Sequence, residues 1–306
     1  MKKIILLFIA GIVFIQGATA CDICGCGVGS YYIGILPEFS KKIVGIRYRY
    51  NTLRTHIGAG GQTTYLTTTE TYQTAEVWGG WTIGKRFRAM AYLPLNFNEK
   101  TSEGATHTKS GLGDIAVQGF YQVFDQRKSV KEKLLLHSLW LGAGIKLPTG
   151  NYQAPEKNGA NPSANIFQLG TGSVDFMLNG MYDIRLQDAG INTFVSYKVN
   201  MANNEAYRYG NKLSANMQFY YKFRIKQKVT LAPNAGVLYE RAGQDVDQGY
   251  SVDVSGGHAC LATAGVETAF KRLALGASFQ HPFSQNLANG FVKANNRAML
   301  HLSFIF

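Results

Sequence analysis

The sequence predicts an all-β fold, a transmembrane up-and-down antiparallel β-barrel of about twelve strands, and three observations support this prediction. Apolar and polar side chains alternate over most of the chain, as the two faces of an extended strand require. Short turns and long polar loops also alternate along the chain, which is typical of barrels in outer membranes. In the last stretch, finally, Ala298, Leu300, Leu302, Phe304 and Phe306 share one face of a strand that runs to the carboxyl terminus.

The first twenty residues have the pattern of a secretory signal peptide. Lys2 and Lys3 precede an apolar run from Ile4 to Ile15, and small residues at Ala18 and Ala20 suit the cleavage site. We therefore expect residues 1–20 to be removed. No later segment approaches the roughly 18 consecutive apolar residues of a transmembrane helix. An exported chain of this kind is a barrel, a secreted protein or a soluble periplasmic protein.

Residues 21–40 form a Cys- and Gly-rich head without clear periodicity, and residues 41–306 form the predicted barrel. Residues 30–39 could add a strand or a plug segment, so fourteen strands remain possible. The alternation predicts strands at about residues 44–50, 69–83, 87–97, 115–123, 134–147, 174–182, 191–199, 213–223, 229–240, 258–270, 273–279 and 297–306.

The connections fall into two classes. We expect outward-facing loops at Leu53 to Thr68, Asn98 to Ser110, Asn151 to Leu169 and Arg241 to Gly257. Short turns such as Gly84-Lys85 and the charged stretch Asp125 to Lys133 would face the periplasm. A large soluble sandwich or secreted adhesin is the alternative, but strands of about 10 to 14 residues exceed the about 5 or 6 usual in soluble sheets.

An apolar strand ending in Phe306 also resembles the sorting signal of bacterial outer-membrane barrels. We therefore expect a protein of the Gram-negative outer membrane, inserted by the barrel-assembly machinery through its last strand, with lipid and lipopolysaccharide as neighbours. The formal charge of +12 falls to about +10 once Lys2 and Lys3 leave. Such a basic balance can indicate nucleic-acid binding, but export excludes this, and lipopolysaccharide phosphates or anionic solutes are expected instead.

Charged residues on the predicted inner face are mostly basic, and we expect them to line the lumen. They are Arg47, Arg49, Glu76, Arg86, Arg88, Asp114, Lys146, Asp175, Lys198, Lys212, Lys222, Glu240, Glu267 and Arg297. They could form ion pairs that fill and stiffen a wet lumen, or a basic passage that favours anions. Twelve strands predict a narrow or plugged pathway. No catalytic site is predicted, since His301 and Ser303 project in parallel about 7 Å apart.

The head contains the pattern Cys21-x-x-Cys24-x-Cys26. Thiolates at this spacing suit Cu(I) or Zn(II). In an oxidising periplasm a disulfide such as Cys21–Cys24 is the alternative, and lipidation of Cys21 is another. A covalent c-type haem is disfavoured because Gly25, not His, follows Cys24.

Three further motifs stand at predicted strand ends: SGLGDIAV at Ser110 to Val117, GAGIKLPTG at Gly142 to Gly150 and QLGTGSVDF at Gln168 to Phe176. With these motifs the chain resembles the outer-membrane transporter family known as the putative meta-pathway phenol-degradation (MetA) proteins. The resemblance covers about residues 40–306. It implies uptake of aromatic or other hydrophobic compounds through a channel and not by an enzyme.

The expected function is thus facilitated diffusion of a small hydrophobic, aromatic or anionic solute across the outer membrane. One alternative is a barrel that handles copper or zinc through its thiol-rich head. The other is a structural or adhesive barrel that transports nothing.

Overall fold

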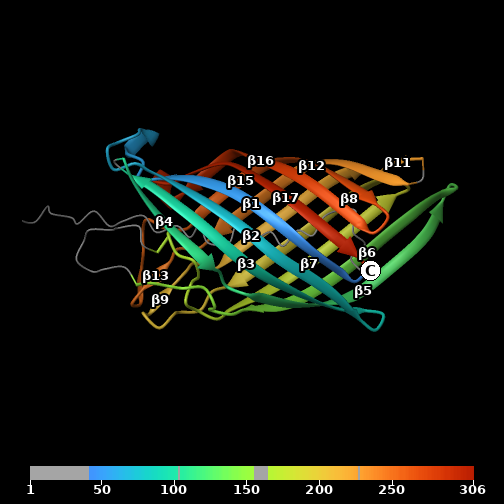
Figure 1. Ribbon diagram of the computed structural model, residues 1–306, viewed down its shortest axis with the longest axis horizontal. Helices are drawn as coiled ribbons and strands as arrows, with labels where there is room; N and C mark the ends of the chain where they lie inside the picture. Colours follow the sequence, from blue (N-terminus) through green and yellow to red (C-terminus); the bar gives the residue numbers. More distant parts are fainter. Residues whose placement is uncertain (1–40, 103, 155–164, 227) are drawn as a thin grey trace, which may run out of the picture.

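The chain folds into one closed antiparallel β-barrel in the computed structural model, which describes residues 41–102, 104–154, 165–226 and 228–306 (Figure 1). Its wall consists of β1 (Ile43–Thr55), β2 (Thr68–Ile83), β3 (Phe87–Ser102), β5 (Ala116–Val130), β6 (Lys133–Lys146), β7 (Asp175–Leu186), β8 (Ala189–Val199), β10 (Lys212–Tyr221), β12 (Val229–Ala242), β15 (Gly257–Phe270), β16 (Leu273–Leu287) and β17 (Lys293–Ile305).

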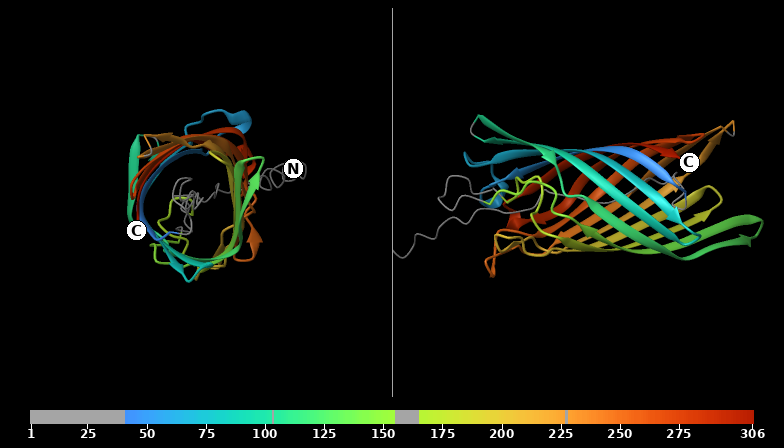
Figure 2. Two further views of the ribbon diagram at one scale, coloured as in Figure 1. Left: turned by 90° about the vertical axis from the view of Figure 1, so that its right-hand side faces the viewer. Right: turned by 60° about the horizontal axis from the view of Figure 1, so that its bottom comes forward.

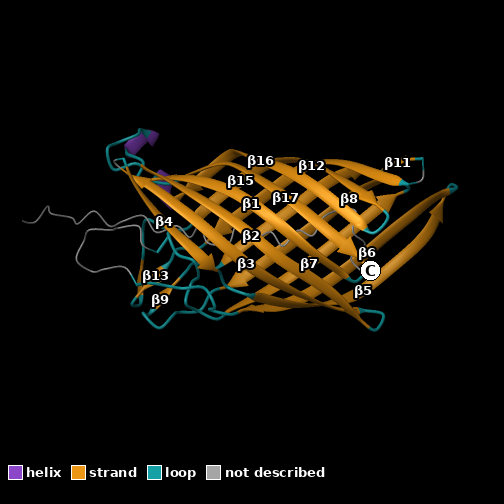
Figure 3. Cartoon of the chain, viewed as in Figure 1, coloured by secondary structure: helices purple, strands orange, loops and turns teal. Residues whose placement is uncertain are grey.

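Each strand pairs with its neighbour in the chain, and β1 pairs with β17 to close the ring. The closed ring is seen end-on in Figure 2. The predicted fold and the count of twelve strands are confirmed for the described residues. The secondary structure there is almost entirely strand, with two short 3-10 turns, η1 (Ala59–Gly61) and η2 (Ala288–Gly290) (Figure 3). No helix in the described part of the chain has the length and apolar character needed to cross a membrane.

The two faces of the wall differ in the way that the alternation predicts. In β1, Ile46 is 57% exposed on the outer face, whereas Arg47 beside it is only 2% exposed on the inner face. The same arrangement of exposed apolar and buried polar side chains repeats around the barrel, where exposed apolar residues include Leu178, Phe219 and Leu275. A wide exposed apolar band suits contact with lipid acyl chains. Exposure of such a band to water would be strongly unfavourable.

Aromatic pairs stand on the outer surface near the short turns. The rings of Trp81 and Phe306 lie 5.4 Å apart, and those of Tyr221 and Phe223 lie 4.7 Å apart. Such rings form girdles at the boundary between hydrocarbon and water. They mark where the wall leaves the membrane at this end.

The predicted loop Asn98 to Ser110 is mostly strand, so that prediction was wrong. β3 continues to Ser102 and pairs with β4 (Ala105–Leu112) across a turn that contains Gly104, whose φ is +80°. β4 pairs with the second half of β3, from Leu95 to Ser102, and β5 pairs with its first half, from Phe87 to Tyr92. β4 is largely exposed on both faces, whereas Asn98 and Lys100 on the β3 side of the hairpin are buried. Because the buried positions are polar, the hairpin shows no alternation of apolar and polar residues.

The charged stretch Asp125 to Lys133 is not a turn either. β5 runs to Val130, and only Lys131 and Glu132, with φ of 44° and 66°, form the turn to β6. The small strands β9 (Tyr207–Arg208), β13 (Val246–Asp247) and β14 (Tyr250–Ser251) form a separate sheet among the long loops. β11 (Phe223–Ile225) pairs with the start of β12.

Candidate functional site

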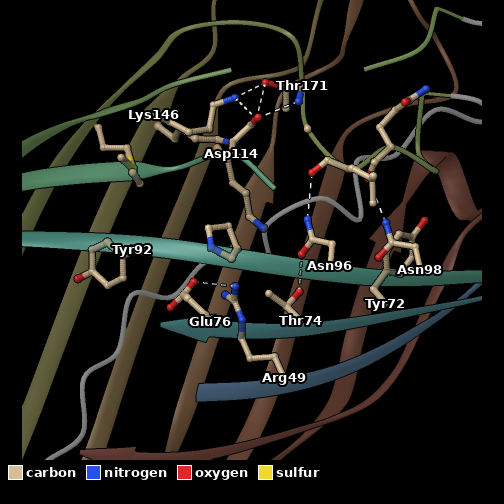
Figure 4. A pocket seen from close by; sticks show the side chains of 18 of the residues that line it. Arg49, Tyr72, Thr74, Glu76, Tyr92, Asn96, Asn98, Asp114, Lys146 and Thr171 are labelled. Atoms are coloured by element: carbon tan, nitrogen blue, oxygen red, sulfur yellow. Dashed lines mark hydrogen bonds and ion pairs between the residues drawn. The ribbon is translucent and has the colours of Figure 1, made fainter. Parts of the chain in front are cut away.

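The segment Asn165–Ser173, here called the inward segment, folds into the barrel at its long-loop end (Figure 4). Ile166 is fully buried, as are Gln168 and Thr171. The sequence placed residues up to Leu169 in an outward-facing loop, and for Asn165 to Leu169 that prediction was wrong. Polar side chains of the wall replace the water that an outward loop would bind.

Four side chains of the wall and loops hold the backbone of the inward segment. Asn96 Nδ2 donates to the carbonyl oxygen of Leu169 at 3.0 Å, and Asn98 Nδ2 donates to that of Gln168 at 3.0 Å. The hydroxyl of Tyr72 donates to Ile166 O at 3.3 Å, and that of Tyr209 donates to Asn165 O at 3.0 Å. Buried carbonyl groups thus have partners, as burial requires.

Lys146, Asp114, Asp175 and Thr171 form a buried network, here called the clasp. Lys146 Nζ lies 2.6 Å from Asp114 Oδ2 and 2.8 Å from Asp175 Oδ2, and it also donates to the Thr171 hydroxyl. The Thr171 amide donates to Asp114 Oδ2 at 2.9 Å. The clasp therefore joins the ends of β6 and β7 to the inward segment.

Backbone groups close around the same carboxylate. Gly150 N donates to Asp114 Oδ1 at 3.0 Å, and the Thr149 hydroxyl donates to Gly113 O at 2.8 Å. A Cβ on Gly170 would lie only 2.8 Å from Gly150 Cα, so this close approach requires glycine. The three sequence motifs of the chain thus meet at one point, Asp114 from the first, Lys146 to Gly150 from the second and Gly170 to Asp175 from the third.

A cavity of about 100 Å³ lies between the inward segment and the wall. Its charged lining comprises Arg49, Glu76, Asp114, Lys146, Lys198 and Lys212. Lys198 and Lys212 face each other directly in the register of β8 and β10, an arrangement that raises the positive potential between them.

Cations outnumber carboxylates in two of the ion-pair groups around the lumen. Glu76 pairs with both Arg47 and Arg49, the latter at 3.2 Å. Glu240 pairs with Lys212 at 3.2 Å and with Arg297 at 2.8 Å. In the clasp the ratio is reversed, because two aspartates share Lys146.

A second cavity of about 70 Å³ shares Lys198 and Lys212 with the first and reaches the loops that follow β8 and β12. Asp245 lies in its lining, where its carboxylate accepts bonds from the Tyr207 hydroxyl and the Gly210 amide, both at 2.6 Å. Burial raises the pKa of Asp245 to about 6 despite these bonds. Asp245 therefore ties two loops together at the entrance.

An apolar belt continues the pathway from the first cavity. It is a cluster of buried residues that comprises Ile43, Trp78, Met90, Tyr92, Ala116, Phe120, Trp140, Met177, Met181 and Phe194. Tyr92, Ala116 and Met177 also line the cavity, so the two are continuous. The belt was not predicted from the sequence, where only charged and polar residues of the inner face were assigned to the lumen. The residue pattern could have revealed it, since Met90, Met177 and Met181 stand at inner-face positions.

The other predicted lumen residues lie in different places. Arg88 is buried and Glu267 lies 3.8 Å from His301 Nε2, both on the inner face. The Lys222 ammonium stands 5.3 Å from the centre of the Tyr220 ring at the short-turn end. Arg86 is different: it is an exposed turn residue that donates to the Tyr121 hydroxyl at 3.2 Å on the outer surface. It does not line the lumen because the turn extends from Gly84 through Arg86, one residue beyond the predicted Gly84-Lys85 turn.

The predicted metal ligands Cys21, Cys24 and Cys26 lie outside the described residues. Within the residues that are described, no group of three or more His, Cys, Asp or Glu side chains could hold a metal ion.

The comparisons with known proteins agree with this architecture. The chain resembles the COG4313 outer membrane channel from Pseudomonas putida F1, with a TM-score of 0.62, 14% identity, and coverage of 92% of this chain and 100% of that one. It also resembles the β-domain of the Bordetella autotransporter BrkA, with a TM-score of 0.50, 13% identity, and coverage of 87% and 100%. No curated protein sequence matches the chain.

These structural similarities concern the fold alone. The assignment to a family rests on a match to the amino-acid sequence. The closed barrel and its exposed apolar band place the protein in the outer membrane, embedded in its lipid. The profile of one family, described as "Putative MetA-pathway of phenol degradation", matches residues 47–297, which include all three motifs that meet at the clasp. The chain therefore belongs to this family.

Proposed function

We propose that the protein is a channel, and not an enzyme, through which small solutes with an apolar body and an anionic group diffuse across the outer membrane. The observation that carries this proposal is the juxtaposition of two surfaces inside the barrel. The cation-rich cavity beside the inward segment opens directly onto the apolar belt.

Each surface suits one part of such a solute. Lys198 and Lys212, on facing positions of β8 and β10, can attract a carboxylate or phenolate. Trp78, Trp140 and Phe120 offer aromatic faces that favour contact with a ring. Most outer-membrane channels have a polar interior, so a buried belt of this kind supports passage of an amphipathic solute over passage of a sugar or a metal ion.

The size of the pathway supports a selective channel. A cavity of about 100 Å³ holds a few water molecules or a small organic group. A wide diffusion pore of sixteen or more strands has an aqueous lumen instead. The inward segment is therefore proposed to restrict passage to small solutes.

Proteoliposome swelling with matched solutes tests the proposal. We expect benzoate to enter faster than benzylamine, which has the same ring and the opposite charge, and faster than a sugar of similar mass. In planar bilayers under a salt gradient, the reversal potential should show a preference for anions. The variant Lys198→Met should reduce both effects.

The control is Lys85→Met, which removes an equal charge from an exposed turn. It should behave as the unmodified protein does. A cation-selective reversal potential would exclude the anionic part of the proposal. Equal swelling rates for aromatic and sugar solutes would exclude the role of the apolar belt.

A further inference from the structure

The hairpin of β5 and β6 extends beyond the other short turns of the barrel (Figure 1, green). β3 pairs with β5 only as far as Tyr121, and the last bond along this edge runs from Gln122 N to Arg86 O at 2.8 Å. An irregularity in the β5–β6 register follows between Gln122 and Phe124. Among the described residues, Phe124 to Val130 pair with β6 alone, which leaves an open edge of about 24 Å.

This open edge lies outside the membrane. The Phe124 ring lies 5.1 Å from that of His137 and 6.5 Å from that of Tyr182, and these three rings form an aromatic cluster at the base of the hairpin. The residues 125–134 beyond it are exposed on both faces of the hairpin. Since the short turns of such barrels face the periplasm, the edge stands in periplasmic water.

The turn geometry shows which backbone groups the open edge presents. Lys131 and Glu132 both have positive φ, which defines a two-residue turn closed by a hydrogen-bonded pair of Val130 and Lys133. Alternate residues of an antiparallel pair bond outward. The N–H and C=O groups of Asp125, Arg127 and Ser129 therefore point toward the open edge.

We propose that the edge Phe124–Val130 binds an extended acidic segment of a periplasmic protein as an added strand. Unpaired strand edges of this length are natural templates for another chain. The hairpin carries Arg127, Lys128, Lys131 and Lys133 against Asp125 and Glu132. This surplus of positive charge opposes indiscriminate pairing and favours an acidic partner.

A second copy of this chain fits the edge less well. Pairing the whole edge antiparallel with its own copy places Arg127 opposite Arg127 and leaves Lys128 without an acidic neighbour. Like charges directly opposite each other destabilise a strand pair. An acidic partner removes this repulsion and satisfies the same three donors and three acceptors.

The test uses the full protein in micelles and a synthetic heptapeptide of alternating Glu and Val as the probe. Amide hydrogen exchange followed by NMR should slow at Asp125, Arg127 and Ser129 when the peptide binds. Ser129→Pro removes one outward amide, and an edge position without a bond inside the hairpin tolerates proline. We expect it to weaken binding about tenfold, while the matched Ser129→Ala, which keeps the amide, stays within about twofold.

Charge is tested with a second peptide in which Lys replaces each Glu. Weaker binding of this peptide supports the proposal. Equal binding of both peptides, or unchanged exchange at the three amides, overturns it. If Arg127→Glu abolishes binding but Ser129→Pro does not alter it, attraction between side chains is the whole effect, and strand addition is also overturned. The solute selectivity of the channel should be the same in all these variants, so this test stands apart from that of the channel function.

Discussion

The clasp can be broken at its centre by Lys146→Met, which keeps an unbranched side chain only one heavy atom shorter and removes its charge. The side chains of Asp114 and Asp175 are only 8% and 0% exposed. The substitution removes the ammonium group that their two carboxylates share. Removing one partner of a buried ion pair costs about 3 to 5 kcal/mol. Asp114 keeps its bonds from two amides, and Asp175 keeps those from Ser173 and Met201, so the lower end of this range is expected.

A cost of about 3 kcal/mol corresponds to a change of roughly a hundredfold in an equilibrium constant. If the clasp holds the inward segment in place, this cost shifts the segment toward displaced states. Single-channel recordings in planar bilayers should then show larger or noisier currents for Lys146→Met. Denaturation in detergent should show a lower midpoint. The double variant Lys146→Met/Asp175→Asn, which also removes one uncompensated charge, should recover part of the loss.

Lys85→Met serves as the control for removal of a charge, since Lys85 is exposed in the turn between β2 and β3. The reasoning is refuted if Lys146→Met matches the unmodified protein in current and in denaturation midpoint. It is also refuted if the double variant is less stable than the single one.

Three other predictions concern single positions. The pKa of Asp245 is about 6 in the folded protein against 3.8 for a free side chain, so the folded state binds more protons between these values. Stability should therefore fall by up to about 3 kcal/mol as pH rises from about 4 to about 6 and stay level above it; Asp245→Asn should flatten this slope in denaturation curves recorded across that range. Gly170→Ala should lower the free energy of unfolding by about 1 to 3 kcal/mol because its Cβ would meet Gly150, and an effect no larger than that of Gly119→Ala, where the space is open, would contradict the close packing. Deletion of Phe306, whose amide bonds to Lys42 O at 3.1 Å where β17 meets β1, should reduce the amount of barrel assembled in the outer membrane, measured by heat-modifiable gel mobility; undiminished assembly would show that the terminal aromatic residue is not read.

The wall of the barrel could be predicted well from the chain. In β1, Ile46, Tyr48 and Tyr50 face outward, and Arg47 between them is buried. Such strands sit between lipid and lumen, and this boundary imposes a period of two on the side chains. The signal disappears where the boundary ends. β4 and the tip of the β5–β6 hairpin are exposed on both faces, and the buried positions of β3 opposite β4 are the polar residues Asn98 and Lys100, so these sequences resembled loops and turns.

The interior could be predicted only in part. Alternation placed Lys146, Asp114 and Asp175 on the inner face, and each is found in the clasp. The two aspartates meet at the Lys146 ammonium only because β5, β6 and β7 pair side by side and the loop before β7 folds back. No local sequence pattern encodes this arrangement. Arg86 shows the opposite failure, since a shift of one residue at a turn moves a side chain out of the lumen.

The sequence by itself determined the class of fold, the strand number, the membrane-facing surface and the family, because each of these is written in local periodicity or in short motifs. Only the tertiary structure decided that the three motifs form one clasp, that the inward segment narrows the lumen, and that charged and apolar surfaces adjoin along one pathway. These features arise from contacts between residues up to about a hundred positions apart, such as Tyr72 with Ile166. The closure of the barrel sets those distances, and closure is a property of the whole chain.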